Sequence, residues 1–353
     1  MRTSRAWRTR LAACAAILVA AVLRAPTHAF PPGLYRDEAF YGLDGRATLT
    51  DGPRLWYPAN NGREPLFVWL VALSEWAAAP PPTASASERI AAVRLPALAA
   101  SLVLVAALFA VAARLAGRRA GLVAAFLAAA LPWAALLGRT GLRAGLLPPV
   151  LALAAAATLR GLAAGDRGDG RAAGRWVVGG GALAGLALST YTAARALPIA
   201  VLLAVGLARW AAGRSGRGDR PRTVRSARLA ARWTVAAVIT ALPLAVAVVR
   251  TPGALLGRLR QVAVAGGAEA GAAAFGGVGP TAAALLDSAG RTAGMVFVAG
   301  DRIARHNIPL RPVFGPLSAA LWLFGLIVLA RWLRPGAPPA RRRAAAVAVA
   351  ATL

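Results

Sequence analysis

Long apolar runs separated by short polar segments recur along the whole chain. A bilayer core about 30 Å thick needs roughly 20 apolar residues in a helix, and somewhat fewer where flanking arginines reach the surface. Runs of that kind fall at about residues 8–24, 90–114, 119–138, 144–160, 174–191, 194–210, 231–250 and 315–332. A further run follows residues 341–343 and stops at Leu353, so we expect the chain to end inside a helix, as a fragment would. The pattern predicts an all-α integral membrane protein, a multi-span helical bundle of about eight or nine helices.

Two segments between the predicted spans are long. The first, about 25–89, contains the apolar and aromatic run from Pro65 to Ala79, which suits a helix that lies at the membrane interface. The second, about 251–314, is rich in Gly and Ala and includes a predicted helix over 281–299. Asp287 and Arg291 stand four apart in that helix, a spacing at which they can pair. We therefore treat residues 1–353 as a single transmembrane domain with two outer loops that contain helices.

Composition changes the interpretation of the charge. Hydrophobic residues make up 58% of the chain, charged residues only 15%, and the mean hydropathy is +0.58. In a soluble protein a net charge of +28 would suggest nucleic acid as a partner. Here every basic residue is an arginine, and most arginines lie in short segments beside apolar runs, where they set the topology. The lipid bilayer is the expected partner, and we set nucleic-acid binding aside.

Arginines alternate between the two sides that the predicted spans define. With the N-terminus inside, the inside segments are the arginine-rich ones, at about 2–10, 114–119, 160–175, 209–232 and 331–343. This agrees with the positive-inside rule and predicts a multi-pass cell-membrane protein with a cytoplasmic N-terminus. All acidic residues except Asp166, Asp169 and Asp219 then lie outside, a skew that the rule does not explain.

The candidate chemistry lies on the predicted outer face. Asp37 and Glu38 form an acidic pair in the first outer loop; by themselves, two adjacent loop carboxylates are usually solvated. The same face receives basic and polar residues from later segments, namely Arg94, Arg139, Arg143, Tyr191, Arg195, Arg305, His306 and Asn307. A bound phosphate is one reason to keep arginines there, because guanidinium presents paired donors to phosphate oxygens. Separate contacts of each arginine with lipid headgroups are the other.

Several short motifs of the outer face resemble those of a known family. They are residues 35–41 (YRDEAFY), 62–70 (GREPLFVWL), 94–96, 139–143, 190–198 and 300–307. In this order they resemble polyprenyl-phosphate-sugar-dependent glycosyltransferases of family 39, which include protein O-mannosyltransferases and the lipid A aminoarabinose transferase. The resemblance implies a GT-C fold, a lipid-linked monosaccharide donor, catalysis on the extracytoplasmic side, and a catalytic centre at Asp37 and Glu38. One departure is the order Arg63-Glu64 before Pro65, where the aminoarabinose transferases have an acid followed by a base.

Sugar transfer from a polyprenyl phosphate to a hydroxyl or similar group needs a carboxylate that takes the acceptor proton and cations that stabilise the leaving phosphate. We assign the base role to Asp37, and to Glu38 the orientation of the acceptor or the binding of a divalent ion together with Asp37. The phosphate candidates are Arg94, Arg143, Arg195 and Arg305. The other predicted substrate-binding residues are Arg63, Glu64, Arg139, Tyr191, His306 and Asn307. The acceptor, whether protein, lipid or glycan, stays open.

No residues have the spacing of a zinc site, since His28 and His306 are the only histidines and Cys14 the only cysteine. A divalent metal ion stays open as a cofactor. Two functions compete with the glycosyltransferase. A secondary transporter would place ionisable residues and broken helices near the bilayer midplane and often shows repeats, which we do not find here. A catalytically silent membrane protein of the same fold is the other alternative.

Overall fold

The computed structural model of the chain describes residues 2–25, 33–59, 62–81, 83–213, 220–251, 282–302, 308–334 and 336–352. Within these ranges the regular elements are helices, which confirms the predicted all-α class. They are α1 (Arg2–Arg24), α2 (Arg36–Asp51), α3 (Pro65–Ala78), α4 (Ala86–Ala116), α5 (Arg118–Ala130), α6 (Pro132–Arg139), η1 (Arg143–Leu146), α7 (Leu147–Asp166), α8 (Gly170–Ala187), η2 (Thr192–Ala196), α9 (Leu197–Gly213), α10 (Arg220–Arg250), α13 (Ala282–Phe297), α14 (Pro316–Trp332) and α15 (Pro339–Thr352).

Three described helical segments are long and apolar enough to cross a membrane, namely Glu88–Ala116, Arg143–Asp166 and Ala227–Arg250. The predicted span 119–138 is two helices, α5 and α6, that meet at an angle of 59°. The break falls at Leu131, before Pro132, because proline disfavours helical backbone in the residue that precedes it. Counted as one span, this bent pair makes a fourth candidate. The shorter apolar helices include Pro316–Trp332, so length and composition alone support fewer spans than the eight or nine expected.

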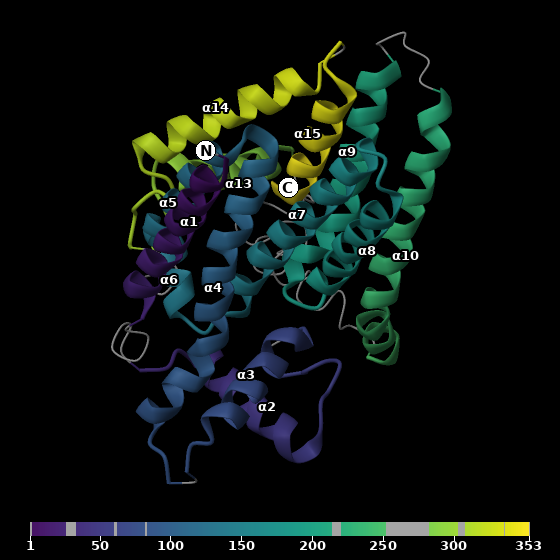
Figure 1. Cartoon of the computed structure of the whole chain (residues 1–353). Coiled ribbons are helices and arrows are strands. Elements are labelled where there is room, and N and C mark those ends of the chain that lie inside the picture. Colours follow the sequence, from purple (N-terminus) through teal and green to yellow (C-terminus); the bar gives the residue numbers. More distant parts are fainter. Residues whose placement is uncertain are drawn as a thin grey trace.

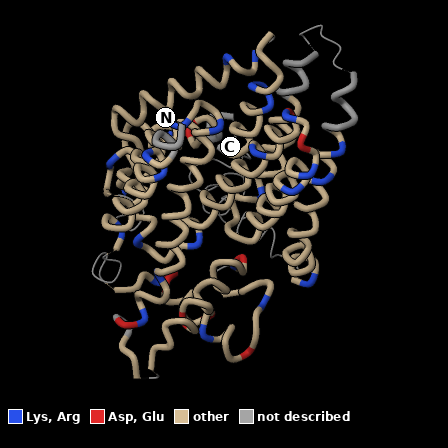
Figure 2. Tube along the Cα trace, viewed as in Figure 1, with Lys and Arg blue, Asp and Glu red and all other residues tan. Residues whose placement is uncertain are grey.

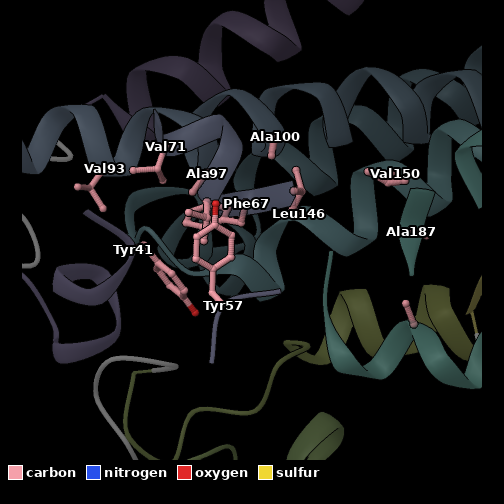
Figure 3. Packing of buried hydrophobic residues seen from close by; sticks show 12 residues of the cluster. Tyr41, Tyr57, Phe67, Val71, Val93, Ala97, Ala100, Leu146, Val150 and Ala187 are labelled. Atoms are coloured by element: carbon pink, nitrogen blue, oxygen red, sulfur yellow. The ribbon is translucent and has the colours of Figure 1, made fainter. Parts of the chain in front are cut away.

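Helices α2 and α3 lie together at one end of the molecule, beside the start of the long helix α4 (Figure 1). They pack on the start of α4, with Tyr41, Phe67 and Val93 in a buried cluster that extends to Val150 on α7 (Figure 3). The rings of Tyr41 and Phe67 meet edge to face with centroids 5.1 Å apart. Small residues allow this close packing: a Cβ at Gly45 would lie 2.9 Å from a methyl of Val71. Acidic residues are concentrated in this end, whereas basic residues are spread over the whole molecule (Figure 2).

Helix α3 does not present Glu75 to a membrane interface. The Glu75 side chain is buried and pairs with Arg89 of α4, with Oε2 and Nη1 3.4 Å apart. The large apolar residues of α3 that are exposed are Leu73 and Trp76.

Two further pairs of helices pack closely. Helix α8 approaches α10 through glycines, since a Cβ at Gly181 would lie 2.1 Å from the Trp233 carbonyl oxygen. Helix α13 packs against α14 through the rings of Phe297 and Trp322, with centroids 5.3 Å apart. The predicted pair on α13 is confirmed, with Asp287 and Arg291 joined at 2.9 Å.

Candidate active site

The acidic pair predicted from the sequence lies in the first turn of α2. The Tyr35 amide precedes the helix and donates to Glu38 Oε2 at 2.8 Å, so the carboxylate covers one of the free backbone N–H groups at the helix start. Asp37 is half-buried beside it. The helix macrodipole stabilises negative charge in this first turn.

Glu38 and Arg94 form a fully buried ion pair. Arg94 donates to both oxygens of Glu38, from Nε at 2.7 Å and from Nη2 at 2.9 Å. The Gly141 amide adds a third donor at 2.6 Å. Position 141 suits glycine, because a Cβ there would lie 3.0 Å from the Val93 carbonyl oxygen. With the Tyr35 amide, four donors surround a carboxylate that has no exposed surface. This geometry favours a positioning role for Glu38 over the expected contact with the acceptor or an ion. Arg94, which we expected at the phosphate, holds Glu38 instead.

A second buried carboxylate, Glu64, joins segments that are far apart in the sequence. It lies directly before Pro65, the first residue of α3, and is fully buried. Its Oε2 accepts from Arg143 Nη1, and its Oε1 accepts from Arg195 Nη2 at 2.9 Å and from the Thr192 hydroxyl at 3.1 Å. The start of α3 is also tied to the end of α8, since the Leu66 amide donates to the Ser189 carbonyl at 3.1 Å. The segment between α2 and α3 therefore meets η1 and η2 at Glu64.

Aromatic rings cover the two guanidinium groups that bind Glu64. The Arg143 guanidinium carbon lies 5.4 Å from the Tyr191 ring centroid, and that of Arg195 lies 6.0 Å from the Trp56 ring centroid. Cations at such distances are attracted to the face of the ring. The rings thus fix the directions in which both arginines point.

Arg63 lies in a buried position between two rings of α2. Its guanidinium carbon is 5.3 Å from the Phe40 centroid and 5.2 Å from the Tyr41 centroid, and Nη2 pairs with Asp44 Oδ2. Burial lowers the pKa of Arg63 and raises the pKa of Asp44, and the partner's charge opposes each shift. Within the described residues, Arg63 Nε and Nη1 have no hydrogen-bond partner although the side chain is 1% exposed. Such buried donors are uncommon and call for an explanation.

Tyr41 lies at the centre of these charges. Its side chain is 4% exposed, and burial raises the pKa of its phenol to about 12. Arg143 and Arg63 oppose that shift, whereas Asp37 and Tyr191 add to it. Asp37, Arg63, Arg143 and Tyr191 therefore all lie close enough to Tyr41 to act on the charge of its phenol.

Arg139 lies elsewhere. Its Nε donates to the Leu23 carbonyl at 2.9 Å and its Nη2 donates to the same oxygen, so it caps the C-terminal end of α1. Nearby, the fully buried Arg24 binds Ser101 Oγ at 2.6 Å and the Ala129 carbonyl at 2.9 Å. These contacts indicate that both arginines join helix ends. Arg305, His306 and Asn307 lie outside the described residues.

Sequence reasoning missed several members of the site. They are Tyr41, Asp44, Trp56 and Thr192, together with the amide of Gly141. Tyr41 and Thr192 lie inside the motifs that carry the resemblance, so those motifs could have identified them as site residues. Trp56 lies outside the motifs, and nothing in the sequence indicates its contact with Arg195. Among the described residues, no three His, Cys, Asp or Glu side chains gather as a metal site would need.

Comparisons with known proteins give one matching family profile and several structures of similar fold. Residues 65–215 match the profile of the family described as dolichyl-phosphate-mannose-protein mannosyltransferase. No curated protein sequence matches the chain significantly.

Solved structures align with nearly the whole chain at low sequence identity. The Archaeoglobus fulgidus oligosaccharyltransferase in its apo form aligns with a TM-score of 0.56 and 16% identity over 97% of this chain and 49% of that one. The same organism's AglB, in complex with an inhibitory peptide and a dolichol-phosphate, aligns with a TM-score of 0.58 and 16% identity over 98% and 50%. ArnT from Cupriavidus metallidurans aligns with a TM-score of 0.48 and 17% identity over 99% and 60%.

The chain thus spans about half the length of the oligosaccharyltransferases that it matches. The matched profile begins at Pro65, directly after the buried Glu64, and includes Arg94, Arg143 and Arg195. The chain thus has a GT-C fold, and its residues 65–215 are similar to the dolichyl-phosphate-mannose-protein mannosyltransferase family.

Proposed function

We propose that this protein is a membrane glycosyltransferase that moves a monosaccharide from a polyprenyl-phosphate donor to a hydroxyl or similar group of an acceptor on the extracytoplasmic side. The observation that carries the proposal is the gathering of Asp37, Tyr41, Arg63, Arg143 and Tyr191 around one end of α2. The match to a mannosyltransferase family supports the reaction class. The dolichol-phosphate bound to AglB, which has the same fold, supports a lipid phosphate as the donor's carrier.

In this proposal Asp37 takes the proton of the acceptor as the sugar C1 bond to the new oxygen forms and the bond to the phosphate oxygen breaks. The transition state resembles an oxocarbenium ion, which a nearby carboxylate stabilises. The Asp37 carboxylate is suited to this role because the paired Glu38 holds the turn on which it lies. The leaving polyprenyl phosphate gains negative charge, so it needs cations close by.

Arg63 is our first candidate for the phosphate, because two of its buried donors have no hydrogen-bond partner among the described residues. Arg143 and Arg195 also carry donors at this end, but Glu64 already holds one nitrogen of each. We therefore propose that Glu64 orients these two arginines and that they complete the phosphate site.

The test is transfer of radiolabelled sugar from polyprenyl-phosphate donors in membranes that contain the protein at equal levels. Asp37→Asn keeps the size of the side chain and removes its charge, so we expect transfer to fall by about 100-fold or more. Asp51→Asn, at the exposed far end of the same helix, is the matched control and retains activity. Full activity of Asp37→Asn would refute its assignment as the base.

A positioning role for Glu38 has a different signature. Glu38→Gln lowers the rate less than Asp37→Asn does, because Glu38 does not take the acceptor proton. If no donor supports transfer by correctly inserted wild-type protein, the transporter and the silent membrane protein become the better interpretations.

A further inference from the structure

A basic groove lies between α8 and α10, far from the candidate active site. The cavity of about 720 Å³ is lined by Arg171, Gly174, Arg175, Val178 and Arg232. Arg171, Gly174, Arg175 and Val178 follow the i, i+3, i+4, i+7 spacing of one helix face. Three guanidinium groups therefore border one concave surface.

Among the residues that the structure describes, no carboxylate lines the groove. The acids closest in sequence are engaged in other contacts: Asp166 pairs with Arg343 at 2.6 Å, and Asp169 accepts from the Ala172 amide at 2.9 Å. The missing side chain at position 174 makes room for a guanidinium, since a Cβ at Gly174 would lie 2.6 Å from Arg232 Nη1. The lining thus concentrates positive charge where an anion with several oxygens can bind.

The groove lies in the first half of α8, and the candidate active site lies beyond the end of that helix. Helix α8 has 18 residues, which corresponds to about 27 Å at 1.5 Å per residue. Arg171 is near its first residue, and the Ser189–Arg195 segment that joins Glu64 follows its last. The Arg171 end of the groove and the candidate active site are therefore separated by most of a hydrocarbon thickness. The exposed Val178 adds an apolar wall on the side toward the membrane interior.

A second groove has the same character. It has a volume of about 580 Å³, lies where α1 meets α5, and is lined by Arg8, Thr9, Arg118, Arg119 and Leu122. In both grooves arginines from two helices surround a concavity that has an apolar residue at its edge. The arrangement is therefore a repeated feature of this end of the helices.

We propose that the α8–α10 groove binds the phosphate headgroup of an anionic phospholipid in the leaflet opposite the candidate active site. Basic pockets between membrane helices bind anionic headgroups, and each arginine near such a surface contributes to the attraction. The guanidinium groups hold the phosphate oxygens, and Val178 contacts the start of an acyl chain. A lipid fits the groove better than a free anion because charge and apolar wall lie side by side at membrane depth.

The test uses the full chain in nanodiscs of phosphatidylcholine, to which phosphatidylglycerol is added while bound lipids are counted by native mass spectrometry. We expect saturable binding of phosphatidylglycerol, weakened about tenfold or more in Arg171→Gln/Arg175→Gln. The control Arg331→Gln/Arg334→Gln removes the same charge from exposed positions at the end of α14 and keeps the affinity. An equal loss in both double variants would overturn the proposal, because it would show a general effect of charge.

A second variant tests the shape of the groove without changing charge. Gly174→Leu displaces the Arg232 guanidinium and should weaken phosphatidylglycerol binding, whereas Gly179→Leu, at a position with open space, should not. Unchanged binding in Gly174→Leu would contradict the site. Glycerol phosphate is the soluble competitor; if it displaces the lipid at equal concentration, the ligand is a free phosphate and the assignment to a lipid is wrong.

Discussion

At the scale of single residues, we expect mutation of the buried pair of Glu38 and Arg94 to lower the stability of the protein strongly. Removing one charge from a fully buried pair leaves the other without compensation, which costs about 3–5 kcal/mol. We expect Glu38→Gln to lower the stability of the detergent-solubilised protein by this amount in a denaturation experiment. Asp51→Asn breaks the exposed pair with Arg54 and should cost about 1 kcal/mol at most. Equal stability of the two variants would show that the pair is not buried as described.

Substitutions of two glycines in the segment between α2 and α3 measure backbone strain and steric overlap separately. Gly52 and Gly62 both have positive φ, at 90° and 83°. A Cβ at Gly52 meets nothing within 4 Å, whereas one at Gly62 would lie 2.2 Å from Cζ2 of Trp56. Gly52→Ala should therefore cost only the strain, about 1–2 kcal/mol. Gly62→Ala should cost clearly more and should also lower transfer activity, because Trp56 contacts Arg195.

At the scale of elements, the contact of α8 with α10 depends on small residues. A Cβ at Gly185 would lie 2.0 Å from the Ala237 carbonyl oxygen, as close as the overlap at Gly181. We expect Gly181→Leu to separate the two helices and to lower the melting temperature of the protein. Gly179→Leu, on the open side of the same helix, is the control. A similar melting temperature for both leucine variants would contradict this close packing.

The elements themselves could largely be predicted, because apolar runs long enough for a membrane leave a strong local signal. The run 90–114 corresponds to α4 and 231–250 lies within α10. The break between α5 and α6 was missed, since the apolar run continues through Leu131 and only Pro132 marks the bend. Partners in the site could not be predicted in the same way. The sequence placed Glu38 and Arg94 on one face, but a pairing across 56 residues leaves no periodic pattern.

At the scale of the whole molecule, the grooves bring together arginines that the charge alternation assigns to the same side. Arg8 meets Arg118, and Arg175 meets Arg232, each from a different predicted inside segment. The sequence predicted only that these arginines share one side, and it gave no contacts between the helix ends.

Cysteine labelling tests which side each end faces. In a Cys14→Ser background, we expect Arg46→Cys on α2 to react with a membrane-impermeant maleimide in intact cells. Arg167→Cys, at the exposed end of α7, should react only after the membrane is permeabilised. The Cys14→Ser protein without a new cysteine should stay unlabelled. The opposite labelling pattern would invert the proposed topology and place Asp37 in the cytoplasm.

The long sequence distances within the site have a consequence for biosynthesis. Glu38 precedes Arg94 by 56 residues and the Gly141 amide by 103, while Glu64 precedes Arg143 by 79 and Arg195 by 131. A ribosome makes these partners in order, so Glu38 lacks its last partner until residue 141 has been made, and Glu64 lacks its last arginine until residue 195 has been made. Completion of the candidate active site is therefore a late event of translation, and a chain released just before residue 195 would carry Glu64 with Arg143 but without Arg195.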